Sequence, residues 1–175
     1  MKFGNDNINE FQRITSLNPN FDYNINIREI FSKELIFVNK IALFANINDL
    51  FDEDIDNYQI NYLDYSAFFG SIKIFKFLLM KKIEMNRFIT FFAIAGGNLE
   101  IVRILDQHNL DFSDSLKIAT SFHRHDVFLW LIENEKCIID GETLCHATMK
   151  ANLEDLLYMF DNNIDPNLPN RQGWS

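Results

Sequence analysis

The stretch AIAGGNLEIVRIL (93–105) combines the end of one short helix, a Gly-Asn turn and an apolar second helix. Apolar residues after the turn recur with the 3.6-residue period of a helix that buries one face. Two further stretches have the same layout, AFFGSIKIFKFLL (67–79) and ATMKANLEDLLYMF (147–160). The repetition predicts a tandem array of helix pairs, an architecture that usually presents surfaces to partners.

A small or turn-forming residue between the two helices of each pair sets the register of the repeat. These turn positions are Ala45, Gly70, Gly97, His123 and Ala151. Their separations are 25, 27, 26 and 28 residues, which predicts four clear units and a weaker first one. A small residue four positions earlier in each clear unit fits a close contact between paired helices. We therefore expect an all-α solenoid of about four to five short repeats.

The residues around each turn favour helix ends. Gly70 and Gly97 can close the first helix in the left-handed conformation without a steric penalty. Polar residues that can cap the second helix follow the turns at Asn46, Ser71, Asn98 and Asn152. The pair His123–Arg124 breaks this pattern, so we expect a less favourable cap there but no missing repeat.

Composition agrees with a helical array. The 175 residues are 47% hydrophobic, with 18 Phe but only 6 Gly and 3 Pro, so a sizeable core is expected and a turn-rich β-fold is not. We expect Leu105, Trp130 and Phe160 in that core. The formal charge of −9 and the lack of a basic stripe argue against nucleic-acid binding.

The sequence also indicates a compartment. The only two cysteines are Cys137 and Cys145, and no signal peptide or glycosylation sequon is present, which favours free thiols in the cytoplasm. Lysines interrupt the most apolar stretch, so no membrane-spanning segment is expected.

Residues 91–105, FFAIAGGNLEIVRIL, resemble the ankyrin-repeat pattern L-H-x-A-A-x-x-G-H-L-E-I-V-x-L-L. The end of the chain is similar to the finger that opens an ankyrin unit, with IDPN at 164–167 followed by Asn170, Gly173 and Ser175. On this resemblance the next turn would fall at position 184, 33 residues after Ala151, which is the usual ankyrin period. The resemblance therefore implies a chain that belongs to a longer array.

The inner units depart from the ankyrin pattern. Periods of 25 to 28 residues are too short for a long hairpin finger, and Asp64, Phe91, Lys117 and Cys145 replace the His of the L-H motif. Residues 60–136 are similar to a divergent short-repeat ankyrin subfamily of unknown function that is expanded in some parasitic protists.

We divide the chain into three parts on these patterns. Residues 1–40 are expected to form an N-terminal helical cap with a frayed, Asn-rich start, and one long helix is expected at Arg28–Leu43. Residues 41–161 form the repeats, and residues 162–175 form the opening finger of a further repeat.

Three groups of residues suggest chemistry, and each has a simpler explanation. Asp52, Asp54 and Asp56 have the spacing of calcium ligands, but Leu63 stands where the loop needs a bidentate Glu. A solvated acidic loop is the better interpretation.

The two other groups contain histidine. His123 and His125 are two residues apart across a turn, not at the i, i+4 spacing of helical zinc ligands. Cys145 and His146 are neighbours on a helix, where side chains diverge by about 100° and cannot form a nucleophile–base pair. We therefore expect no metal, no cofactor and no catalysis. A metal-assisted enzyme built on His123 and His125 is kept as a remote alternative.

The resemblance implies a non-catalytic protein-binding module, because in ankyrin arrays the residues before each turn line a concave groove. The corresponding positions here include Phe68, Phe69, Ala95, Ser121, Phe122, Met149 and Lys150. For Phe69 and Phe122, contact with a partner and packing between short units both remain open. The partner is an unidentified protein, and the chain is expected to be a monomer or part of a longer chain. The alternative is a spacer or cap of a longer ankyrin protein, with no partner of its own.

Overall fold

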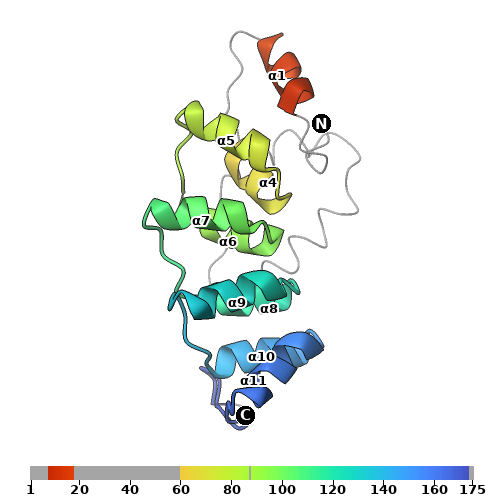
Figure 1. The fold of residues 1–175 in the computed structure, drawn as a ribbon, viewed down its shortest axis with the longest axis vertical. Coiled ribbons are helices and arrows are strands. Elements are labelled where there is room, and N and C mark those ends of the chain that lie inside the picture. Colours follow the sequence, from red (N-terminus) through yellow and green to blue (C-terminus); the bar gives the residue numbers. More distant parts are fainter. Residues whose placement is uncertain (1–7, 18–59, 87, 174–175) are drawn as a thin grey trace. The chain divides into compact units, whose positions relative to one another are not determined.

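The computed structural model describes residues 8–17, 60–86 and 88–173, and all regular structure in these ranges is helical (Figure 1). The all-α prediction is therefore confirmed for this part of the chain. The chain divides into two compact units after Asn86, and each is described by itself. The first unit contains α1 (Ile8–Ser16), α4 (Tyr62–Phe68) and α5 (Ile72–Met80). The second contains α6 (Ile89–Gly96), α7 (Leu99–Gln107), α8 (Ser115–Ser121), α9 (His125–Glu133), α10 (Gly141–Met149) and α11 (Leu153–Asp161).

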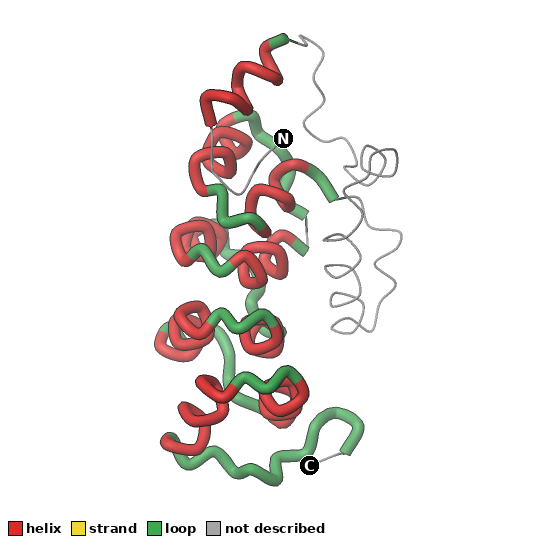
Figure 2. The backbone as a smooth tube through the Cα atoms, turned by 90° about the vertical axis from the view of Figure 1, so that its right-hand side faces the viewer, coloured by secondary structure: helices red, strands yellow, loops and turns green. Residues whose placement is uncertain are grey.

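The helices of the second unit form three pairs, α6–α7, α8–α9 and α10–α11, each joined by a short turn (Figure 2). Helix α8 packs against α6 on one side and α10 on the other, and α9 packs against α11. The pairs are therefore stacked on one another, and helix α4 pairs with α5 in the same way within the first unit.

The predicted turn positions are confirmed in the four described pairs. The backbone is left-handed at each, with φ of +62° at Gly70, +77° at Gly97, +53° at His123 and +52° at Ala151. His123 and Ala151 adopt this conformation despite the steric cost of a Cβ atom. The backbone therefore has the same left-handed conformation at all four turns, even where another residue replaces glycine. Ala45 and Asn46 lie outside the described residues.

A second left-handed residue ends the second helix of every described pair. These residues are Lys82, Asn109, Glu135 and Asn163, with φ between +54° and +57°, and each lies twelve positions after the turn residue of its own unit. This set was not predicted from the sequence, because Lys and Glu are not turn-forming residues. Each described unit consequently contains two helix ends with a left-handed residue, twelve positions apart.

The small residue before each turn has two functions. Ser66, Ala93, Ala119 and Ala147 are all fully buried, as the expected contact between paired helices requires. Three of them also accept the hydrogen bond that closes a left-handed helix end, at 2.9 Å from Ser71 N, 2.8 Å from Arg124 N and 2.8 Å from Asn152 N.

The caps of the second helices follow the predictions in part. Asn98 Oδ1 accepts from Glu100 N at 3.0 Å, and Asn152 Oδ1 accepts from Asp155 N at 3.2 Å. The Ser71 hydroxyl makes no capping bond to α5, so that prediction is wrong. Arg124 does not cap α9, as expected.

The Arg124 side chain instead reaches back to the preceding pair. Its Nε donates to the Ala95 carbonyl near the end of α6 at 2.7 Å. A Cβ on Gly97 would lie 2.6 Å from Arg124 Cδ. Gly97 is therefore required both for its positive φ and for the space that Arg124 occupies.

The core contains two of the three residues that we expected there. Leu105 and Trp130 are buried, but Phe160 is 48% exposed, so that prediction is wrong. The buried position of each second helix lies eight residues after the turn, and in α11 this residue is Met159. Phe160, one position later, points about 100° away from it.

Helix α1 (Ile8–Ser16) lies in the region for which we expected a helical cap, and residues 1–7 lie outside the described residues. The buried Phe11 ring contacts the rings of Tyr62 and Phe77, with centroids 6.0 Å away in each case, and α1 packs against α5. The predicted helix at Arg28–Leu43 lies outside the described residues.

Residues 162–173 contain neither helix nor strand, and Pro169, Asn170 and Arg171 lie against α10. A Cβ on Gly141 would come within 2.1 Å of the Pro169 carbonyl oxygen, so this close contact requires glycine. Arg171 N donates to Glu142 Oε1 at 2.8 Å. The segment is therefore held to the beginning of the last helix pair.

Candidate protein-interaction surface

The seven residues predicted to line a groove differ widely in exposure. Phe69 is 41% exposed and Met149 is 70% exposed. Four others are half-buried: Phe68, Ser121, Phe122 and Lys150. Ala95 is fully buried, so its side chain offers no surface to a partner. Phe68 and Phe69 belong to the first unit, and the other five belong to the second.

In the first unit, Phe69 is part of an aromatic cluster at the end of α4. Its ring lies 4.6 Å from that of Tyr65 and 5.3 Å from that of Phe68, centroid to centroid. Burial raises the pKa of the Tyr65 hydroxyl above its usual value of 10.0. The Phe69 ring is thus held by its neighbours while about two fifths of it remains accessible.

In the second unit, Phe122 and Ser121 contact neighbouring pairs. The Phe122 ring packs edge-on against Phe91 of α6, with centroids 6.1 Å apart. Ser121 Oγ lies 3.1 Å from His146 Nδ1 on α10. The end of α8 is therefore connected to both of the pairs that flank it.

Burial lowers the pKa of His146 below its ordinary value of 6.5, so the neutral ring is favoured in the folded chain. Because the unfolded chain takes up this proton at a higher pH than the folded chain, acidification below 6.5 favours unfolding. We expect the urea midpoint to fall between pH 7.5 and pH 5, and to fall less in His146→Gln. The measurement is chemical unfolding followed by circular dichroism at both pH values. An equal loss in both proteins would contradict this role of His146.

A buried polar network that was not predicted from the sequence lies between α9 and α11. His125 Nδ1 lies 2.6 Å from Asp155 Oδ1, and Asn152 Nδ2 donates to Asp155 Oδ2 at 2.7 Å. The same Nδ2 donates to the Thr120 carbonyl at 2.9 Å. The Asp155 side chain is fully buried. A carboxylate is thus enclosed between two helix pairs and is satisfied by their polar groups.

The repeat register contained a signal for this network. Asp155 lies four residues after its turn, where the other units have Ile74, Ile101 and Val127, all buried. The neighbouring acid, Glu154, has a side chain that is 69% exposed. An acidic residue at a position that is otherwise apolar indicates a buried polar partner, and His125 provides it.

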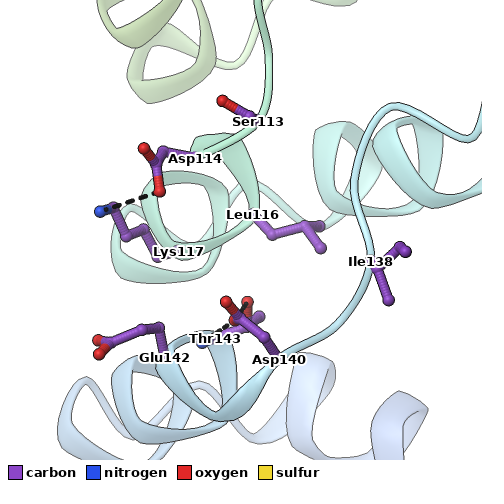
Figure 3. Close-up of a pocket in the computed structure, with 8 residues that line it drawn as sticks. All are labelled: Ser113, Asp114, Leu116, Lys117, Ile138, Asp140, Glu142 and Thr143. Atoms are coloured by element: carbon purple, nitrogen blue, oxygen red, sulfur yellow. Dashed lines mark hydrogen bonds and ion pairs between the residues drawn. The ribbon is translucent and has the colours of Figure 1, made fainter. Parts of the chain in front are cut away.

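A shallow hollow lies between the beginnings of α8 and α10 (Figure 3). Lys117 Nζ lies 3.3 Å from Asp114 Oδ1, and Arg171 also donates to that oxygen, at 2.8 Å. The two other acids of the hollow, Asp140 and Glu142, accept hydrogen bonds from backbone N–H groups. Burial alone would raise the pKa of Asp114, but Lys117 and Arg171 lower it overall. The groups therefore join residues 162–173 to α8 and offer little to a ligand.

The residues considered for metal binding are not brought together. Among the described residues, no group of three His, Cys, Asp or Glu side chains could hold a metal ion. His123 is exposed at the turn, whereas His125 faces Asp155. Cys137 and Cys145 are both free and half-buried, and burial raises the pKa of the Cys137 thiol. The Asp52–Asp56 run lies outside the described residues.

No protein-family model matches this chain, and neither a curated protein nor a solved structure is significantly similar to it. Within the described part of the chain, no helix is long and apolar enough to cross a bilayer. The fold and the repeated helix ends define a helical, repeat-like protein. Its closer identity and its function follow as proposals.

Proposed function

We propose that this chain is an ankyrin-type repeat protein that binds a protein partner, without catalysis, through the concave surface at the ends of its first helices. The observation that carries the proposal is the constant backbone at the four turns, combined with variable side chains just before them. Phe69, Gly96, Phe122 and Lys150 occupy the same position in successive units. Constant geometry with variable side chains is what a repeat protein needs to present a specific surface.

The mechanism of binding is shape and preorganisation. Helix pairs that are already held by neighbouring pairs lose little conformational entropy when a partner docks. Phe69 and Met149 provide exposed apolar contacts of the kind that dominate protein interfaces. Two free thiols agree with a cytoplasmic protein. The paired charges of the hollow give no support to a metal-assisted enzyme.

The proposal is tested by affinity capture with a matched pair of variants, followed by mass spectrometry. The test variant carries Phe69→Glu and Met149→Glu, and the control carries Ile138→Glu and Met80→Glu, which are also exposed apolar positions. Both must retain the helicity and melting temperature of the parent protein. We expect a partner that is captured by the parent and the control but not by the test variant. If all three proteins captured the same set of partners, the proposal that the concave surface binds a partner would be contradicted.

The second candidate is a spacer within a longer ankyrin protein. It is favoured by the contacts of Phe122 with Phe91 and of Ser121 with His146, and by the burial of Ala95. Three of the seven candidate residues thereby contribute to packing. A folded protein that captures no specific partner in the same experiment would support this function.

A further inference from the structure

One face of α11 carries three large apolar side chains at the surface. Leu153, Leu157 and Phe160 are 69%, 62% and 48% exposed, respectively. Separated by four and three residues, they lie along one side of the helix, and we call them the α11 stripe. The opposite side of the helix contains Asp155 and Met159, which are fully buried. Helix α11 therefore has two apolar-containing faces, and only one of them is covered by described residues.

The preceding unit shows what kind of element fits such a face. Twenty-eight residues earlier, the equivalent positions are His125, Leu129 and Ile132 of α9, and all three are half-buried. Helix α11 packs against α9 there, and His125 contacts both Asp155 and the ring of Tyr158. In this unit the first of the three positions, His125, thus contacts a helix of the following pair. An α-helix is consequently the element whose shape matches the α11 stripe.

The acidic residues near the α11 stripe favour a binding helix that carries basic side chains. Residues 151–170 contain four acidic side chains and no Lys or Arg. Apart from the buried Asp155, these acids are exposed: Glu154, Asp161 and Asp165. Glu154 and Asp161 lie on the same edge of the stripe, about 70–90° from its centre, and a second copy would bring the same acids to the contact, which opposes association. A helix with basic edges would instead be attracted.

We propose that the α11 stripe binds an amphipathic helix of a partner protein, with apolar residues along one side and Lys or Arg along its edges. This site rests on the proposed protein-binding function but uses a surface separate from the ends of the first helices. Apolar contact supplies the affinity, and the acidic edge formed by Glu154 and Asp161 sets the orientation and the preference for a basic partner.

The test uses a labelled synthetic peptide of about five helical turns, with leucines along one side and lysines at its edges. Its binding to the full chain is measured by fluorescence anisotropy. We expect binding to weaken at least about tenfold in the Leu153→Glu, Leu157→Glu double variant, and to be unchanged in Ile138→Glu. Raising the salt concentration should also weaken it, because charges contribute. Circular dichroism verifies that both variants are folded.

Three peptide and variant controls decide the proposal. A peptide with glutamate in place of lysine, and one with the same composition but no apolar side, should bind weakly. Equal binding by either peptide, or by the double variant, would overturn the proposed site. A parent protein that dimerises in sedimentation, and becomes monomeric in the double variant, would overturn it in favour of a second copy. The Phe69→Glu, Met149→Glu variant should still bind the peptide, so failure of the concave surface and failure of this site are distinguishable.

Discussion

Replacement of Trp130 by alanine is expected to lower the free energy of unfolding by about 3–5 kcal/mol, the range for truncating a large core side chain. Trp130 is buried on α9, and its indole packs edge-on against Phe112, with ring centroids 5.9 Å apart. Alanine would leave a cavity between α9 and the segment that leads into α8. Urea unfolding followed by helical circular dichroism measures the loss.

The matched control is Ile138→Ala, because Ile138 is 89% exposed. A surface substitution of this kind should change stability by less than about 0.5 kcal/mol. Since stability in stacked repeats depends on contacts with nearest neighbours, hydrogen exchange in Trp130→Ala should increase most in α8 and α9. Equal stability losses in the two variants would contradict the assignment of Trp130 to the core.

The second large effect is expected from Asp155→Ala. Removing a buried hydrogen-bond acceptor costs about 1–3 kcal/mol for each donor that is left unpaired and desolvated. Here the His125 ring and the Asn152 amide would each lose an acceptor, at 2.6 Å and 2.7 Å respectively. Chemical unfolding of the variant provides the measurement. Glu154→Ala, next to it but exposed, should change stability little.

A double variant tests whether the stability lost in Asp155→Ala comes from the broken hydrogen bonds to Asp155 or from truncation of a side chain at this buried position. The other units have Ile or Val at the position of Asp155, so the site has the surroundings of an apolar core residue. Replacing a buried pair by apolar residues is often close to neutral. We expect the loss of unfolding free energy in the double variant, His125→Leu with Asp155→Val, to be clearly smaller than the sum of the losses in the two single variants. Strict additivity would show that the two side chains are not coupled.

The repeat could be recognised from sequence because its signals are local. A helix end needs a residue that tolerates positive φ, a small residue before it and often a capping side chain after it, all within about one helical turn. Gly70 and Gly97 satisfy the first requirement by themselves, and Asn98 and Asn152 satisfy the last. The spacing of these signals was enough to place four turns correctly, even where His123 replaces glycine.

The second set of left-handed residues shows the limit of these local signals. Lys82 and Glu135 have no turn preference, yet they adopt the same conformation as Asn109 and Asn163. Hydrogen bonds from the following residues to helix carbonyls close these ends, as from Lys136 N to Leu131 O at 2.9 Å. These helix ends thus depend on backbone hydrogen bonds, which the residue type at the left-handed position does not by itself predict.

The sequence by itself determined the all-helical class, the register of the repeat and the four turn positions, because each depends on residues that are close together along the chain. Only the tertiary structure decided which residues are accessible: the surface candidate Ala95 is buried, Phe122 packs on Phe91, and the core candidate Phe160 lies at the surface. It also decided that Asp155 is enclosed with His125, thirty residues away. The physical reason is that burial in stacked helix pairs is set by the neighbouring pair, whereas helical periodicity describes only one helix at a time.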